Sequence, residues 1–248
     1  MQKEVKEGRQ SLIPKTIHYC WFGRKKKPGL VKKCIKSWKK HCPDYTIIEW
    51  NEDTYDIASS PLFVRQALEA EKWAFAADYV RYRVVYEHGG IYLDTDVEII
   101  KNIDFLLSDS VFFGVQHLDF YPASGLGFGA EKNHPFLKEL MRSYEDNPFR
   151  MKNGAFNQIP CPVRDLPVFC KYGFTAVDQE QILENGVHIY PTEYFCPRIK
   201  GNPFLKKTAN TVMIHRFAAT WLPMTWRIKR RLDEYKYYFL HNLFRFGG

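Results

Sequence analysis

The sequence lacks the patterns of several common protein classes. Its 248 residues include six cysteines, but no Cys-x-x-Cys pair occurs and no cysteine–histidine cluster has the spacing of a zinc site. No run of 18 apolar residues is present, and no motif of a nucleic-acid-binding module occurs. Residues 1–10 are polar and lack the apolar centre of a signal peptide. We therefore expect a cytoplasmic protein with free thiols and no nucleic-acid partner.

The positive charge is concentrated at the two ends of the chain. The net charge is +8, of which residues 1–40 carry +11 and residues 224–248 carry +4, while residues 41–223 carry −7. Basic segments of this kind bind anionic lipid or phosphorylated ligands. We expect three parts: a polar tail over residues 1–12, one folded domain over residues 13–223, and a basic aromatic tail over residues 224–248.

Apolar periodicity predicts an α/β fold. Residues rich in β-branched and aromatic side chains predict strands at 16–22, 45–50, 91–93, 111–115, 187–190 and 211–214. Helical spacing predicts helices at 30–40, 73–88 and 135–144, the second capped by Gly89 or Gly90, and Pro61 at a first helical position predicts a helix at 61–70. The first strand–helix–strand unit indicates a Rossmann-like nucleotide-binding sheet flanked by helices. Segment 156–167, with its prolines and cysteine, is predicted to be a loop.

The C-terminal tail has the pattern of an amphipathic helix. Over residues 226–246, apolar and aromatic side chains recur at steps of three or four beside basic ones. This pattern is typical of a helix lying on an anionic membrane surface, with the protein peripheral on the inner face of the cell membrane. The alternative is a terminal helix packed on the domain.

Two carboxylates follow the buried strand at 91–93. The stretch Gly89–Asp96 reads Gly-Gly-Ile-Tyr-Leu-Asp-Thr-Asp. If strand geometry persists, the side chains of Asp94 and Asp96 point to the same side. Converging carboxylates form an oxygen-rich site that suits Mg²⁺ or Mn²⁺. The position after a strand and a Gly-Gly turn sets this pair apart from the many Asp-x-Asp pairs on solvated loops.

Three further features are candidates for the same site. Asp78 and Arg81 share one helix face at i, i+3 and can pair, either within the site or as an ordinary surface salt bridge. Trp21 ends the first strand, where a ring could stack on a nucleobase or pack in the core. His215 follows a short strand and could complete a Mn²⁺ shell. The glycine-rich stretch 124–129 is interpreted as backbone that a ligand approaches closely.

These residues lie in motifs that resemble bacterial members of glycosyltransferase family 32, which includes sugar transferases of capsule and lipopolysaccharide synthesis and mannosyltransferases. The resemblance rests on several motifs in the expected order from residue 13 to residue 221: Ile13–Gly23, Trp73–Arg81, Gly89–Asp96, Ser124–Ala130, Cys161–Val163, Tyr194–Pro197 and His215–Trp221.

The resemblance implies a GT-A fold and a retaining, metal-dependent hexosyltransferase. It would use a nucleotide-sugar donor, with UDP preferred by analogy, and a saccharide or lipid-linked saccharide acceptor in capsule, exopolysaccharide or lipopolysaccharide synthesis. By the same analogy Asp78, Arg81, Asp94 and Asp96 are the catalytic residues. The donor-binding residues would be Trp21, Asp78, Arg81, Tyr92, Asp94 and Trp221, and the Mn²⁺ or Mg²⁺ ligands would be Asp94, Asp96 and His215.

The chain departs from the family pattern near its C-terminus, where it has His215-Arg216 and Thr220-Trp221. These changes bear on the acceptor or the sugar more than on the reaction. Two other functions compete with the transferase. A two-metal phosphohydrolase would need more closely spaced histidines than the eight present. A non-catalytic protein that binds a sugar nucleotide or a membrane surface could keep the same fold.

Overall fold

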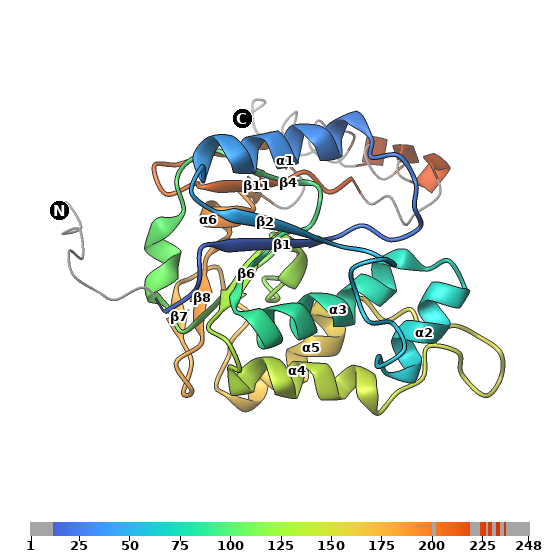
Figure 1. Cartoon of the computed structure of the whole chain (residues 1–248). Coiled ribbons are helices and arrows are strands. Elements are labelled where there is room, and N and C mark those ends of the chain that lie inside the picture. The colour runs from blue at the N-terminus through green and yellow to red at the C-terminus, as the bar shows by residue number, and fades with distance from the viewer. Residues whose placement is uncertain are drawn as a thin grey trace.

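The computed structural model describes residues 12–199 and 202–218 and, within the tail, residues 224–226, 228–229, 232–233 and 236. Its centre is a seven-stranded mixed sheet with the strand order β2-β1-β3-β6-β5-β8-β7 (Figure 1). The strands are β1 (Thr16–Cys20), β2 (Thr46–Trp50), β3 (Gly90–Tyr92), β5 (Val111–Gly114), β6 (Phe128–Ala130), β7 (Gln181–Ile182) and β8 (His188–Tyr190).

The expected βαβ unit is confirmed. Strand β1 pairs in parallel with β2 and with β3, and helix α1 (Gly29–His41) makes the crossover. The carboxyl ends of β1, β2 and β3 therefore meet at one edge of the sheet, where ligands of open α/β sheets bind. Outside the main sheet, β4 (Val97–Ile99) pairs with β11 (Met213–His215), and β9 (Arg198–Ile199) pairs with β10 (Asn202–Leu205).

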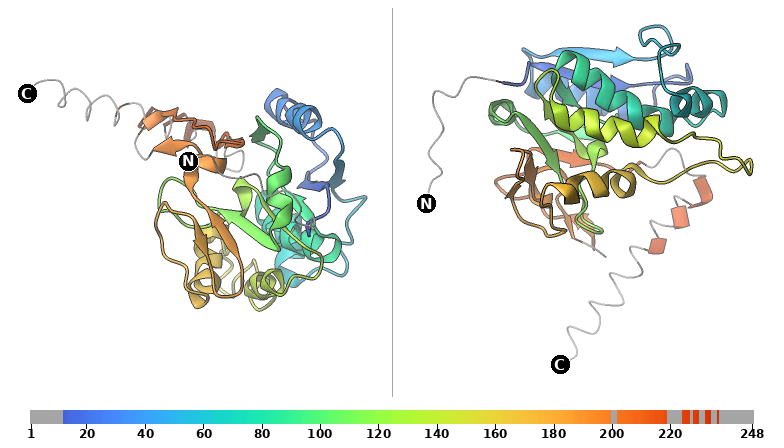
Figure 2. Two further views of the ribbon diagram at one scale, coloured as in Figure 1. Left: turned by 90° about the vertical axis from the view of Figure 1, so that its left-hand side faces the viewer. Right: turned by 90° about the horizontal axis from the view of Figure 1, so that it is seen from below.

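Helices cover both faces of the sheet. Helix α1 lies on one face, and the opposite face carries α2 (Leu62–Glu69), α3 (Trp73–His88), α4 (Pro135–Glu145) and α5 (Cys161–Lys171) (Figures 1 and 2). The short helices η1 (Asp104–Ser108), η2 (Ser124–Leu126) and α6 (Thr192–Phe195) lie in the connections. Each face has its own buried apolar cluster, so the sheet is covered on both sides.

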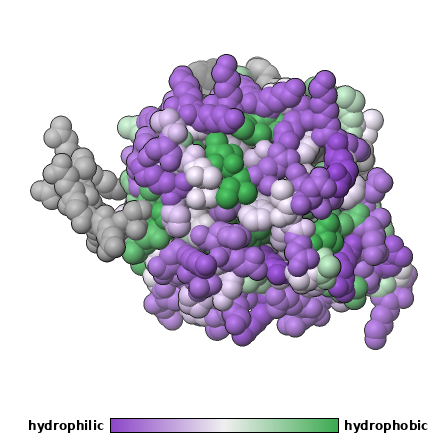
Figure 3. All heavy atoms as spheres, in the orientation of Figure 1, coloured by the Kyte–Doolittle hydropathy of each residue, from purple (hydrophilic) through white to green (hydrophobic). Residues whose placement is uncertain are grey.

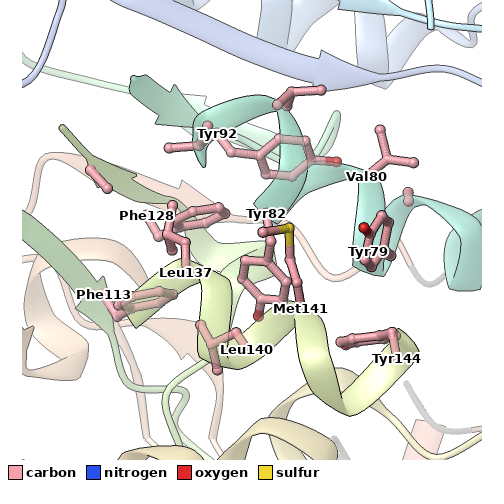
Figure 4. Packing of buried hydrophobic residues seen from close by; sticks show 14 of the residues in the cluster. Tyr79, Val80, Tyr82, Tyr92, Phe113, Phe128, Leu137, Leu140, Met141 and Tyr144 are labelled. Carbon is pink, nitrogen blue, oxygen red and sulfur yellow. The ribbon is translucent and has the colours of Figure 1, made fainter. Parts of the chain in front are cut away.

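Helix α3 is buried around most of its circumference. Between Phe75 and Val85 only Arg83 is not buried, because the helix packs against the sheet on one side and against α2 and α4 on the other. Tyr82 and Tyr144 lie in the cluster drawn in Figure 4, beside Phe128 and Met141. A polar side chain on α3 is therefore placed in a low-dielectric environment.

Most predicted elements are confirmed, with helix 73–88 found at the predicted bounds. The prediction of a loop over segment 156–167 is wrong, because helix α5 begins at Cys161 within it. Pro160 is its N-cap and Pro162 occupies its first turn, where the missing amide hydrogen costs nothing. Two of the three prolines that suggested a loop therefore form a helix start, and the third, Pro167, lies inside the helix.

The tail prediction falls mostly outside the described residues, as do the polar tail up to residue 11 and Trp221. The described tail residues 224–226, 228–229, 232–233 and 236 are helical and exposed. Among the described residues, no helix is both long enough and apolar enough to cross a bilayer.

Candidate active site

The site is built on a buried ion pair in helix α3. Asp78 and Arg81 are 8% and 4% exposed, and Oδ1 of Asp78 lies 2.8 Å from Nη2 of Arg81. The surface salt bridge weighed from the sequence is thus ruled out. Burial raises the pKa of Asp78 to about 6, although Arg81 opposes the shift. Burial opposes the charge of Arg81, but Asp94 and Asp78 raise its pKa above the ordinary value.

Arg81 connects three separate segments of the chain. Its Nη2 lies 3.4 Å from Oδ1 of Asp94, and its Nη1 donates a 3.1 Å hydrogen bond to Oγ of Ser124. Its guanidinium carbon lies 5.1 Å from the centre of the Tyr92 ring. Arg81 thereby holds the end of β3 and the start of η2 against α3 with charge-assisted contacts.

The Asp-Thr-Asp stretch is a turn, which corrects the expected extension of the strand. Strand β3 ends at Tyr92, and the amide of Val97 donates to the carbonyl of Asp94 at 2.9 Å. The carboxylates of Asp94 and Asp96 nevertheless converge with His215: one ligand atom from each lies within 4.8 Å of the others. The convergence comes from sheet pairing, because β4 and β11 place Val97 opposite His215.

Asp96 is held as the charged member of the cluster. Its Oδ1 lies 3.0 Å from Nε2 of His215, and its Oδ2 accepts a 2.7 Å hydrogen bond from the amide of Ala218. Burial alone raises the pKa of Asp96, but His215 and the Ala218 amide outweigh it, so the pKa lies below its usual value. The pKa of Asp94 is raised, chiefly by burial and also by Asp96. Asp96 therefore keeps its negative charge to a lower pH than an ordinary aspartate.

The cluster fits a hard divalent cation. It offers two carboxylates and one imidazole, the donor set that Mn²⁺ accepts and Mg²⁺ tolerates in part. Burial lowers the pKa of His215, whereas Asp96 and Asp94 raise it, with a net rise. Within the described part of the chain, Nδ1 of His215 is buried with no hydrogen-bond partner. The other ring nitrogen, Nε2, faces the Asp96 carboxylate at 3.0 Å and is the one placed to bind a cation together with it.

The glycine-rich stretch makes room for the site's own side chains. A Cβ added to Gly125 would lie 2.5 Å from Oδ2 of Asp94 and 3.4 Å from Nη1 of Arg81. Gly129 pairs within the sheet opposite Ile91 and Phe112. We expected a ligand to approach these glycines closely. In the structure, the groups that approach Gly125 and Gly129 belong to the protein itself.

Gly125→Ala is expected to displace the Asp94 carboxylate and to lower donor turnover by about tenfold or more, since small misplacements of site residues cost that much or more. The matched control is Gly29→Ala, because nothing lies within 4 Å of an added Cβ at Gly29. Steady-state turnover of both variants measures the difference. Unchanged activity in Gly125→Ala would mean that the position of Asp94 is not critical.

Helix α5 contributes residues that sequence reasoning missed. Sγ of Cys161, its first residue, lies 3.6 Å from Oγ of Ser124, which links α5 to Arg81. The buried Asp165 accepts a 2.5 Å hydrogen bond from the hydroxyl of Tyr82, the residue after Arg81. The sequence did contain a signal for this helix, since prolines are favoured at the first positions of a helix. The same rule predicted the helix at Pro61.

Asp165→Asn is expected to flatten the pH dependence of stability. Burial raises the pKa of Asp165 to about 7 from 3.8, so between pH 4 and 7 the folded state holds a proton that the unfolded state has lost. Its stabilising contribution is present below pH 4 and lost as the pH rises through 7, about 4 kcal/mol in all. Urea unfolding of the native protein and the variant at pH 5 and pH 8 measures this contribution. An equal change in the free energy of unfolding between the two pH values in both proteins would contradict the raised pKa of Asp165.

Trp21 lies beside a separate cavity. The cavity has a volume of about 240 Å³ and is lined by Trp21, Arg24, Lys25, Lys27, Glu49, Asn51, Glu52 and Asp53. The indole Nε1 donates to the carbonyl of Lys25 at 2.7 Å, which fixes the ring. The cavity lies beyond the carboxyl ends of β1 and β2, where the nucleobase was expected, and base stacking on Trp21 stays a prediction.

Tyr92 and Arg216 are both held by contacts within the protein. Tyr92 is only 1% exposed and its ring centre lies 5.1 Å from the guanidinium carbon of Arg81, while its contact with a donor stays a prediction. We assign Tyr92 to supporting Arg81. The Nε of Arg216 donates to Glu98 at 2.9 Å, which ties this arginine to β4.

Residues 28–113 match a family described as the glycosyltransferase sugar-binding region containing a DXD motif. This range includes Asp78, Arg81, Asp94 and Asp96. Inositol phosphoceramide mannosyltransferase 3 of Schizosaccharomyces pombe is 31% identical over 156 residues, which is 56% of this chain and 39% of the relative. Mannosyl phosphorylinositol ceramide synthase CSH1 of Saccharomyces cerevisiae is 30% identical over 140 residues, 55% of this chain and 36% of the relative.

The chain thus spans well under two thirds of these two curated relatives. Among solved structures, the PaToxG glycosyltransferase superposes with a TM-score of 0.50 at 19% identity, over 64% of this chain and 69% of that one. This likeness concerns the fold, which is the GT-A type predicted from the sequence. The matched segment is thus similar to the DXD-containing sugar-binding region of glycosyltransferases.

Proposed function

We propose that this protein is a metal-dependent, retaining glycosyltransferase that moves a hexose from a nucleotide-sugar donor to a saccharide acceptor. The observation that carries the proposal is the convergence of Asp94, Asp96 and His215 beside the buried Asp78–Arg81 pair. A lone Asp-x-Asp would be weak evidence. Here the two carboxylates, which lie in a segment that matches a sugar-binding family, meet an imidazole and an arginine in one half-buried cluster.

The protein groups have distinct roles in the proposed reaction. Asp94 and Asp78, both held by Arg81, present carboxylate oxygens that can accept hydrogen bonds from sugar hydroxyls. Asp96 and His215, with Asp94, would hold Mn²⁺ or Mg²⁺. When bound, the cation would neutralise charge developing on the diphosphate. Trp21 offers its ring to the nucleobase at the neighbouring cavity.

We infer retention without a covalent sugar–enzyme intermediate. Asp78 and Asp94 both lie against Arg81, so neither carboxylate is a free nucleophile. In a front-face reaction, the bond from the anomeric carbon to the phosphate oxygen breaks and a bond to the acceptor oxygen forms. The acceptor proton passes to the departing phosphate. Isolation of a glycosylated aspartate would overturn this mechanism.

The proposed acceptor is a lipid-linked saccharide in the synthesis of a capsule, an exopolysaccharide or a lipopolysaccharide. The names of two relatives support a lipid-linked acceptor, since both refer to transfer of mannose to a phosphoinositol ceramide. They also make mannose the first hexose to test. The stacking role inferred for Trp21 favours a uridine carrier by analogy, so uridine and guanosine donors both belong in the test.

The test is release of nucleoside diphosphate from a panel of UDP- and GDP-hexoses, with Mn²⁺ or with EDTA, followed by the anomeric configuration of the product. Metal-dependent turnover of one donor is the expected result. Tight donor binding without turnover, even with a range of saccharide and lipid-linked acceptors, would instead indicate a non-catalytic sugar-nucleotide binding protein.

A further inference from the structure

Helix α1 presents five lysines on one side. Lys32, Lys33, Lys36, Lys39 and Lys40 are all exposed, whereas Val31, Cys34 and Trp38 are buried against the sheet. Successive helical residues are about 100° apart, so the five lysines lie within an arc of about 120°. We call these five residues the α1 lysine face. Figure 3 shows mainly hydrophilic side chains over the upper part of the molecule, where α1 lies in this orientation.

The charge of this face is poorly compensated. Helix α1 contains no acidic residue, and only Lys33 has a carboxylate partner, Glu98 at 3.1 Å. Across the described ranges, no ion pair involves Lys32, Lys36, Lys39 or Lys40. The exposed Lys25 and Lys26 precede the helix and extend the positive surface.

Helix stability does not explain the lysine face. Cations near a helix C-terminus interact favourably with the helix dipole, which accounts for Lys39 and Lys40. Lys32 lies in the first turn, where a cation is unfavourable and the helix has no acidic residue. A concentration of like charges that repel one another and are not needed for folding points to an external anionic partner.

Exposed apolar side chains accompany this charge. Met224, Trp226, Ile228 and Leu232 are 54% to 71% exposed on the described tail residues. In Figure 1 the described tail segments, drawn in orange-red, lie in the upper half of the molecule, as α1 does. A chain that exposes both a basic helix face and a tryptophan with aliphatic side chains suits the boundary between headgroups and acyl chains, whereas a soluble polyanion offers nothing to the apolar groups.

We propose that the α1 lysine face docks the protein on the surface of an anionic lipid bilayer. This inference goes beyond the proposed transferase reaction and does not depend on it. Lipid attraction to each lysine near the surface corresponds to about a fivefold gain in binding. Helix α1 follows directly on the loop that lines the Trp21 cavity, so docking through α1 would hold the candidate site close to lipid-linked molecules.

The test is co-sedimentation of the full chain with phosphatidylcholine vesicles, with or without phosphatidylglycerol, at low and high salt. The variant is the triple substitution Lys36→Gln, Lys39→Gln and Lys40→Gln. Its matched control is Lys132→Gln, Lys138→Gln and Lys152→Gln, which removes the same charge from exposed positions on or beside α4, on the opposite face. Thermal unfolding checks that both remain folded.

We expect binding only to the anionic vesicles, weakened by salt, lowered about a hundredfold in the α1 variant and retained in the control. Equal loss in both variants, or no binding to anionic vesicles at low salt, would overturn the proposal. Equally tight binding to RNA that depends on the α1 lysines would also overturn the proposal. The same holds for vesicle binding that is lost only in Trp226→Ala. Donor turnover without vesicles, measured on the same proteins, keeps a failure of docking distinct from a failure of the transferase proposal.

Discussion

Asp96→Ala is expected to lower metal-dependent donor turnover by about a thousandfold or more. Asp96 contacts His215 and the Ala218 amide, and its lowered pKa keeps it charged. Removing it takes away a metal ligand and its negative charge together, and loss of electrostatic stabilisation at a reacting diphosphate has effects of this size. The measurement is nucleoside diphosphate release over a range of Mn²⁺ concentrations.

The matched control is Glu98→Gln, two residues further along β4. Glu98 is also partly buried and paired, but its partners are Lys33 and Arg216 and it lies outside the metal cluster. We expect this control to keep most of the activity. Direct titration with Mn²⁺, followed by the paramagnetic signal of the free ion, should show weakened binding for Asp96→Ala alone. Equal Mn²⁺ affinity in native protein and Asp96→Ala would place the metal elsewhere.

Arg81→Met is expected to destabilise the fold by about 3–5 kcal/mol and to abolish activity. The substitution leaves the buried Asp78 and the half-buried Asp94 without their counter-charge, and broken buried pairs cost this much. Ser124 also loses its charged donor. Urea unfolding measures the change in free energy.

Arg83→Met supplies the comparison on the same helix. Arg83 pairs with Glu87 at 2.8 Å, but that carboxylate is 45% exposed. Pairs of this kind contribute about 0.3–0.5 kcal/mol, so the loss should be several times smaller than for Arg81→Met. A double variant, Asp78→Asn with Arg81→Met, should recover part of the stability but none of the activity. Similar losses for the two arginines would show that burial does not set the cost at Arg81.

The helices and strands near the site follow from local sequence. The spacing of residues 73–88 predicts a helix at its observed bounds, and the i, i+3 separation predicts the Asp78–Arg81 pair. The turn at Gly89 is also local, since its φ of 68° favours glycine. Helix α5 was missed although its signal was local too, because prolines that permit a helix start were interpreted as helix breakers.

For the lysines of α1 as well, the sequence predicted one part of the arrangement and the tertiary structure decided the other. Their spacing places them on one side of a helix, and the buried Trp38 fixes which side faces outward, with its Nε1 donating to the carbonyl of Val97 at 2.8 Å. The sequence alone could not tell that no carboxylate from another element covers Lys36, Lys39 or Lys40 in the described structure. That depends on which strands and loops pack beside the helix.

By itself, the sequence determined the residue types of the site and their short-range geometry: carboxylates after a strand, a charged pair on a helix, and a tryptophan at the end of the first strand. Only the tertiary structure decided that Asp96 meets Ala218, 122 residues away, that Arg81 meets Ser124, and that the charged pair is buried. The reason is physical. Spacing within a helix or strand is set by local backbone geometry, whereas contacts between distant segments depend on the strand register that packing of the whole core selects.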